Sequence, residues 1–170
     1  MIKGQFSTEG VSSNSTEAFS LCEKSRLGEK VGGKIEYLFV EALFLMEQQK
    51  MEIFQAKNKL NFENILKKIK KIDKNIETKL IVYRDLRKKG YIAKTALKFG
   101  AEFRIYDRGI KPGQDHAKWI MHIAKENENL KWHDFAAKNR IAHSTKKNLL
   151  LAIVDEEKDV SYYEISWKRL

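Results

Sequence analysis

The apolar run Leu149–Val154, LLLAIV, is the part of the sequence that most restricts the fold. An unbroken apolar run of strand length is typical of a strand that is buried on both faces. The acidic segment Asp155–Asp159 follows it, and the aromatic run Val160–Trp167 has the composition of a returning strand, which together predict a hairpin. Together with the earlier runs, the C-terminal half has the order helix, two strands, helix, two strands, which predicts an α/β (α+β) fold with a mixed sheet.

Periodic segments elsewhere predict two domains. Expected strands lie at 2–6 and 51–54, expected helices at 35–50, 61–73, 78–89 and 132–146, and a turn or loose loop at 8–15. Composition changes near residue 80, from lysine-rich helical segments to strands rich in aromatic residues. We therefore expect a small N-terminal α/β domain at 1–80 and a C-terminal domain at 81–170, in which helices flank the mixed sheet.

Two strand-like runs flank the loop Gly109–Asp115, which holds the only proline of the chain. Alternation in the first run places Tyr106 on the face opposite the buried one, at the strand's end. The second run is expected to begin at His116, which by the same alternation also lies off the buried face. Two groups able to transfer protons, at the ends of strands that flank one loop, indicate a candidate active site.

Charge and cysteine content narrow the class of protein. A net charge of +10 favours an anionic partner, such as nucleic acid or an acidic membrane surface, although a lysine-rich composition or a thermophile's surface gives the same value. Cys22 is the only cysteine, which excludes an internal disulfide and a zinc site of the finger type. No apolar run reaches the roughly 20 residues that span a bilayer, and no signal peptide is evident, so we expect a cytoplasmic protein without a membrane partner.

Common catalytic motifs are absent from the sequence. It has no phosphate-binding glycine loop, no dinucleotide fingerprint and no HExxH pattern. The aspartates are scattered and the four histidines do not form a ligand set, which argues against a two-metal nuclease centre. We therefore expect chemistry that uses no metal and no cofactor.

Three motifs together resemble the archaeal tRNA-splicing endonucleases, the tRNA-intron endonuclease family. The motif FRIY ends at Tyr106, DHAKW contains His116 ten positions later, and AHSTKK places Lys147 another 31 positions on, just before LLLAIVDEE. The resemblance implies a nuclease-like catalytic domain at 81–170 and a catalytic triad of these three residues. It also implies a catalytic subunit, because the family's structural subunits lack the intact triad. Asn148 departs from the family, in which a further basic residue is common there.

The resemblance implies a specific reaction. Introns are cut at a bulge–helix–bulge RNA by attack of the 2′-OH, without metal, which leaves a 2′,3′-cyclic phosphate and a 5′-OH. Such a reaction needs a base for the 2′-OH, an acid for the leaving oxygen and a cation for the phosphorane. Tyr106 contributes to the first role, His116 suits the second, and Lys147 suits the third. A free tyrosine, with a pKa of roughly 10, is a poor base unless cations or solvent assist it.

Further residues are assigned to RNA and to assembly. Arg140 and Trp167 are candidates for stacking on bulged bases, against the plainer readings of a helix-end charge and a core or interface aromatic. In the family that the chain resembles, the acidic loop enters a basic pocket of a partner subunit. That role falls here to Asp155, Glu156, Glu157 and Asp159. The resemblance implies a homotetramer, or a heterotetramer with a second endonuclease subunit, that acts on precursor tRNA.

Two alternatives stay open at this point. The first is a non-catalytic RNA-binding or structural subunit of the same assembly, against which the intact triad argues. The second is an unrelated basic nucleic-acid-binding domain, such as a DNA-binding module. The absence of a helix-turn-helix pattern and the pairing of tyrosine and histidine at strand ends weigh against it.

Overall fold

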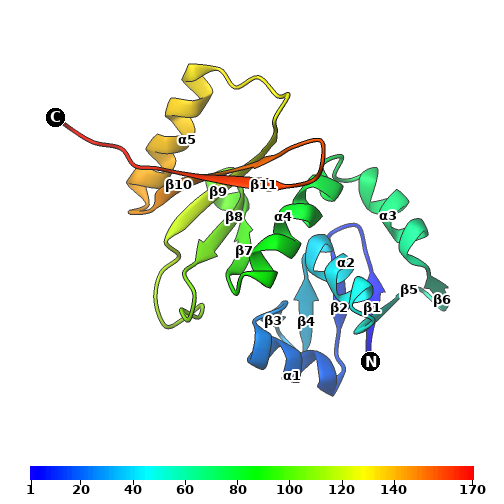
Figure 1. Cartoon of the computed structure of the whole chain (residues 1–170). Coiled ribbons are helices and arrows are strands. Elements are labelled where there is room, and N and C mark those ends of the chain that lie inside the picture. The colour runs from blue at the N-terminus through cyan, green and yellow to red at the C-terminus, as the bar shows by residue number, and fades with distance from the viewer. The chain divides into compact units, whose positions relative to one another are not determined.

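The computed structural model describes residues 1–170 and divides the chain into two compact units, Met1–Leu80 and Ile81–Leu170 (Figure 1). Each unit contains one β-sheet with helices packed on it. The expected α/β (α+β) class, with a mixed sheet in the C-terminal part, is confirmed. The two units are described separately below.

The first unit is built on a six-stranded sheet in the order β3-β4-β2-β1-β5-β6. Its strands are β1 (Ile2–Phe6), β2 (Val11–Ser13), β3 (Glu29–Val31), β4 (Lys34–Tyr37), β5 (Met51–Gln55) and β6 (Asn58–Leu60). Its helices are α1 (Thr16–Ser25), α2 (Phe39–Glu47) and α3 (Phe62–Lys70). The expected strands at 2–6 and 51–54 are confirmed, but α1 was not predicted, and the expected loop at 8–15 contains β2.

The expected helix at 35–50 is wrong in its first part, because residues 34–37 form β4. Ile35 and Tyr37 are buried while Lys34 and Glu36 are exposed, which is the two-residue period of a strand. The helix starts only at Phe39, where the backbone N–H of Leu38 donates to the Glu41 carboxylate at 3.0 Å. A side chain that reaches back in this way satisfies a donor that the helix itself leaves free.

The second unit is built on a five-stranded sheet in the order β11-β10-β9-β8-β7. Its elements are α4 (Ile76–Lys88, which starts in the first unit), β7 (Ile92–Ala96), the 3₁₀ turn η1 (Leu97–Phe99), β8 (Ala101–Tyr106), β9 (Trp119–Lys125), α5 (Trp132–Ser144), β10 (Asn148–Val154) and β11 (Val160–Ile165). Strands β9 and β10 are parallel, and the other neighbours are antiparallel. Strand β7 was not predicted.

Helices cover both faces of this second sheet. On one face the ring of Tyr83 in α4 lies 5.9 Å from that of Phe103, between centroids, and the Tyr162 hydroxyl donates to Asp85 at 2.7 Å. On the other face Ala142 of α5 belongs to a buried cluster that contains Leu149. The run LLLAIV therefore forms a strand with helices on both faces, as predicted, although Leu151 and Ile153 on the α5 face are only partly buried.

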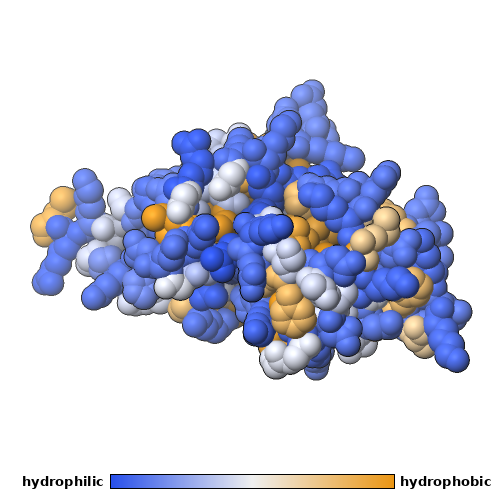
Figure 2. Space-filling model, turned by 90° about the horizontal axis from the view of Figure 1, so that it is seen from below, coloured by the Kyte–Doolittle hydropathy of each residue, from blue (hydrophilic) through white to orange (hydrophobic).

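Hydrophilic side chains cover most of the face shown in Figure 2, and apolar residues appear there in separate small groups. This agrees with a sequence in which a third of the residues are charged. No helix of the chain combines the length and the apolar character that a bilayer-spanning segment requires.

Candidate active site

One edge of the second sheet collects the chain segments that carry the three candidate catalytic residues. In the ladder, Ile105 of β8 pairs with Trp119 of β9, and Trp119 pairs with Asn148 of β10. Because β8 is antiparallel to β9 while β10 is parallel to it, the end of β8 and the starts of β9 and β10 share this edge. Tyr106 directly follows Ile105, and Lys147 directly precedes Asn148, so both lie next to this row of paired residues.

The backbone of Lys118 joins these three segments directly. Its N–H donates to the carbonyl of Ile105 at 2.9 Å, and its carbonyl accepts from the N–H of Asn148 at 3.1 Å. Lys118 lies two residues after His116, Ile105 directly precedes Tyr106, and Asn148 directly follows Lys147. Backbone hydrogen bonds therefore bring together three chain segments, the most distant of which are more than 30 residues apart in the sequence.

Tyr106 occupies the last position of β8 and is buried, with 5% of its surface exposed. It does point away from Phe103 and Ile105, as the alternation predicted, but the prediction that it lies off the buried face is wrong. The reason is that α5 covers the second face of this sheet, so alternation does not separate buried from exposed residues here. The guanidinium carbon of Arg104 lies 6.0 Å from the centre of the Tyr106 ring.

His116 lies in the exposed loop that leads into β9, not in the strand itself. The expected strand start at His116 is wrong by three residues, since β9 begins at Trp119. The backbone N–H of His116 donates to the carboxylate of Asp115 at 2.7 Å, which holds the chain in a local turn. His122, which alternation from His116 would place on the same exposed face, is instead 6% exposed, and its Nδ1 lies 3.2 Å from Lys138 of α5.

Lys147 is held by the backbone at the end of α5. Lys146 adopts a left-handed conformation with φ of 57°, and its N–H donates to the carbonyl of His143 at 2.9 Å. The N–H of Lys147 donates to the carbonyl of Ala142, also at 2.9 Å. This pair of bonds is the Schellman motif, which ends the helix and sends the chain in a fixed direction. Lys147 thus enters β10 from a rigid turn.

The ammonium group of Lys147 lies among other cations. Its Nζ donates to the carbonyl of Thr145 at 3.0 Å, and no ion pair joins it to a carboxylate. Partial burial is the main cause that lowers its pKa, and the nearby charges of Arg104 and Lys98 lower it further. A cation in such surroundings gains from an anionic ligand, as a phosphate would be.

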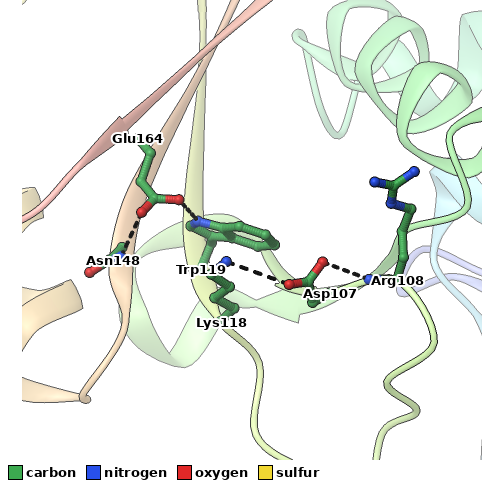
Figure 3. A network of polar contacts seen from close by, with 6 residues as sticks. All are labelled: Asp107, Arg108, Lys118, Trp119, Asn148 and Glu164. Atoms are coloured by element: carbon green, nitrogen blue, oxygen red, sulfur yellow. Dashed lines mark hydrogen bonds and ion pairs between the residues drawn. The ribbon is translucent and has the colours of Figure 1, made fainter.

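Figure 3 shows a polar network at the same edge of the sheet. The Glu164 carboxylate of β11 accepts from the Trp119 indole N–H at 2.6 Å and from the Asn148 side-chain amide at 2.8 Å. It thereby ties β11 to the first residues of both β9 and β10. Trp119 and Glu164 were not predicted as site residues. Trp119 is part of the DHAKW motif, but no pattern in the sequence indicates that Glu164 reaches it.

A second part of the network lies at the end of β8. Asp107 accepts from the backbone N–H of Arg108 at 2.8 Å, and its other oxygen lies 3.5 Å from the Lys118 ammonium group (Figure 3). The Lys118 ammonium also lies 4.4 Å from the centre of the Trp119 ring. Surface pairs of this kind contribute little free energy, so we assign them to local ordering of the loop ends rather than to stability.

Comparison with known proteins finds matching family models in both units of the chain. The family model described as tRNA intron endonuclease, catalytic C-terminal domain, matches residues 76–162, and that described as tRNA intron endonuclease, N-terminal domain, matches residues 2–66. The chain is 40% identical to a tRNA-splicing endonuclease of Thermococcus onnurineus, over 86% of this chain and 84% of that protein. It is 35% identical to one of Methanothermobacter thermautotrophicus, over 99% and 98% of the two chains.

The chain belongs to the tRNA intron endonuclease family. The expected resemblance is confirmed, and the chain is an endoribonuclease whose catalytic domain contains the sheet edge described above. A tRNA-splicing endonuclease of Nanoarchaeum equitans is also similar, with 39% identity over 79% of this chain and 90% of that protein.

The two residues predicted to bind RNA lie toward the C-terminal end of α5 in this endonuclease. Arg140 is exposed on the helix, three residues before His143. The His143 ring packs against that of Trp167, with 4.5 Å between centroids and an angle of 38°. Trp167 is 49% exposed and is therefore not a core residue of this chain. Both side chains are accessible, and their RNA-binding roles stay predictions.

The acidic residues predicted to meet a partner subunit form the tip of the β10–β11 hairpin. The backbone N–H of Asp155 donates to the carbonyl of Asp159 at 3.1 Å, so the expected acidic hairpin turn is confirmed. Glu156, Glu157 and Asp159 are exposed. The backbone N–H of Glu156 donates to Glu126 at 3.0 Å, which anchors one side of the turn. Insertion of this tip into a partner subunit stays a prediction.

The network of Figure 3 yields a first testable prediction for the endonuclease. We expect Glu164→Ala to lower the free energy of unfolding by about 1–2 kcal/mol, because the indole N–H of the buried Trp119 loses its acceptor. Urea unfolding followed by circular dichroism measures this loss. Glu128→Ala, at an exposed position just after β9, is the control and should leave the stability unchanged. Equal stability of both variants would show that the network contributes nothing.

Proposed function

We propose that this chain is a tRNA-splicing endonuclease that cuts precursor tRNA at a bulge–helix–bulge without metal. The observation that supports it most directly is the pair of Lys118 backbone bonds, which gathers the segments of Tyr106, His116 and Lys147 at one sheet edge. The matched catalytic domain and the names of the similar proteins support the choice of tRNA as substrate. The net charge of +10 suits a polyanionic substrate.

In the proposed reaction three side chains divide the work of one transesterification. Tyr106 contributes to removing the proton of the 2′-OH, and the resulting oxygen attacks the adjacent phosphorus. The bond between phosphorus and the 5′-oxygen breaks as His116 donates a proton to that oxygen. Lys147 offsets the additional negative charge on the phosphorane. The products are a 2′,3′-cyclic phosphate and a 5′-OH, so the reaction is that of a lyase and consumes no water.

The stacking and assembly roles belong to the same proposal. Arg140 and Trp167, both accessible near the end of α5, would hold an unstacked base of the bulge. The acidic hairpin tip would enter a basic pocket of a second subunit. Strand β11 lies at one edge of its sheet and has a free side, which a second copy would cover in a tetramer.

The decisive experiment incubates the purified chain with a bulge–helix–bulge RNA in the presence of a metal chelator. We expect cleavage at both bulges, with cyclic phosphate and 5′-OH ends identified by mass spectrometry. A substrate with a 2′-deoxynucleotide 5′ to each cleavage site should bind but stay intact, because it lacks the nucleophile. Cleavage that requires a divalent metal, or that leaves 3′-OH ends, would contradict the mechanism. Binding without cleavage would instead identify a non-catalytic subunit.

A further inference from the structure

The 3₁₀ turn η1, between β7 and β8, contains one cation, Lys98, that the proposed mechanism does not use. The ammonium group of Lys98 lies 5.1 Å from the centre of the Phe99 ring. The ammonium group of Lys147 lies 6.0 Å from the centre of the same ring. Phe99 itself packs against the buried cluster that includes Ala142 and Leu149, so the ring is held in place by the core. Two lysine side chains from distant segments thus share one fixed aromatic ring.

More positive charge lies on this face of the sheet. Arg104 pairs with Lys94 across the β7–β8 ladder, so two cationic residues stand directly opposite each other. Lys94 is buried, so only Arg104 of this pair is accessible from the surface. The charges of Arg104 and Lys98 both act on Lys147. Three cations thus form a row. Arg104 lies beside the Tyr106 ring, and Lys147 and Lys98 lie beside the Phe99 ring of η1. Such a row is the arrangement expected for a path of several phosphates.

Lys98 is available to a ligand. It is exposed, and no ion pair joins it to a carboxylate, whereas other exposed lysines such as Lys34 and Lys59 do form such pairs. Its neighbour Leu97 is 79% exposed, although it is a large apolar residue. An apolar side chain next to a free cation matches the chemistry of a nucleotide, whose base has an apolar face and whose phosphate is charged.

We propose that η1 is an RNA-binding element: Lys98 binds a backbone phosphate beside the scissile one, and Leu97 packs against an unstacked base. The proposal rests on the proposed function, since it takes the ligand to be the RNA substrate. It also specifies the path of the RNA: the RNA strand that leaves the scissile phosphate passes Lys147 and continues over η1. It also gives a reason for the grouping of Lys98, Arg104 and Lys147, which costs repulsion in the free protein.

The test measures binding of the uncleavable 2′-deoxy bulge–helix–bulge RNA at several salt concentrations. Each phosphate contact adds about 0.7–0.9 to the slope of log affinity against log salt. We therefore expect Lys98→Ala to reduce the slope by about that amount and to weaken binding at low salt, while Lys98→Arg keeps the slope. Leu97→Ala should weaken binding without a change in slope. Lys57→Ala, an exposed lysine of the β5–β6 turn, is the control and should match the wild type.

The outcomes separate this proposal from the proposed function. A Lys98→Ala chain with the slope and affinity of the wild type overturns the role of η1, even if the wild type cuts the RNA as expected. A wild type that binds the RNA but does not cut it leaves the slope comparison valid, while the proposed reaction fails. A wild type that does not bind the RNA overturns both. Lys98 and Leu97 are exposed, so melting temperatures should show that the variants stay folded.

Discussion

A His116→Ala chain is expected to bind the bulge–helix–bulge RNA normally and to cut it more slowly by a factor of about 10²–10⁴. The 5′-oxygen is a poor leaving group unless a proton reaches it as its bond to phosphorus breaks. His116 is exposed in its loop, so its removal leaves no cavity and should not affect folding. Single-turnover cleavage at saturating enzyme measures the chemical step, and binding of the 2′-deoxy RNA checks affinity.

A modified substrate makes this test specific for proton donation. With sulfur in place of the leaving 5′-oxygen, departure needs no proton, so the His116→Ala chain should approach the wild-type rate. His133→Ala, an exposed histidine of α5, is the matched control and should cut both substrates as the wild type does. If the sulfur substrate is cut as slowly as the normal one, His116 is not the acid.

Lys147→Ala is expected to reduce the rate of cleavage by about 10²–10³, because the cation that faces the developing charge is lost. On the substrate with the sulfur leaving group, whose departure needs no proton from His116, the wild-type rate should fall at alkaline pH as the Lys147 ammonium loses its proton. This fall should begin below the range of an ordinary lysine, because partial burial and the nearby Arg104 and Lys98 charges lower the pKa of Lys147. Lys147→Arg, which keeps its charge at every relevant pH, should lack this alkaline fall. The measurement is single-turnover cleavage as a function of pH.

Lys146→Ala provides the matched control for Lys147→Ala. The two lysines are adjacent, but Lys146 is exposed and occupies the left-handed position of the helix end, whereas Lys147 is half-buried beside Phe99. Alanine and lysine are equally disfavoured in that conformation, so the turn should persist. We expect cleavage close to that of the wild type. A larger loss in Lys146→Ala than in Lys147→Ala would show that the roles are exchanged.

The sequence predicted those elements whose apolar residues follow one simple pattern, either a continuous run or a helical spacing. Strand β10 was predicted because its apolar run is continuous, and α3 because Ile65 and Ile69 recur at helical spacing. Strand β2 was missed because Val11–Ser13 has the composition of a loop and is a strand only by its pairing with β1 and β4. Strand β7 was missed for a similar reason, since it is defined by its pairing with β8.

The candidate site shows the same limit. The motifs gave the residue types and their order, but burial at the site depends on α5, which comes later in the chain. Alternation alone therefore misjudged Tyr106 and His122, which are both buried, and His122 lies against Lys138 of α5. The role of Glu164 depends on a contact with Trp119 across 45 residues, and nothing in the local sequence of either residue announces it.

The three catalytic candidates differ in how firmly the fold holds them. Tyr106 ends a strand and Lys147 follows a closed helix end, but His116 belongs to a mostly exposed loop. Within that loop the backbone bonds are short turns, such as that from Gln114 to Lys111 at 3.0 Å. Segments of this kind open at a small fraction of the free energy that unfolds the whole domain. On warming, the loop that holds His116 should therefore unfold locally. The enzyme should lose its activity at temperatures at which both sheets are still intact.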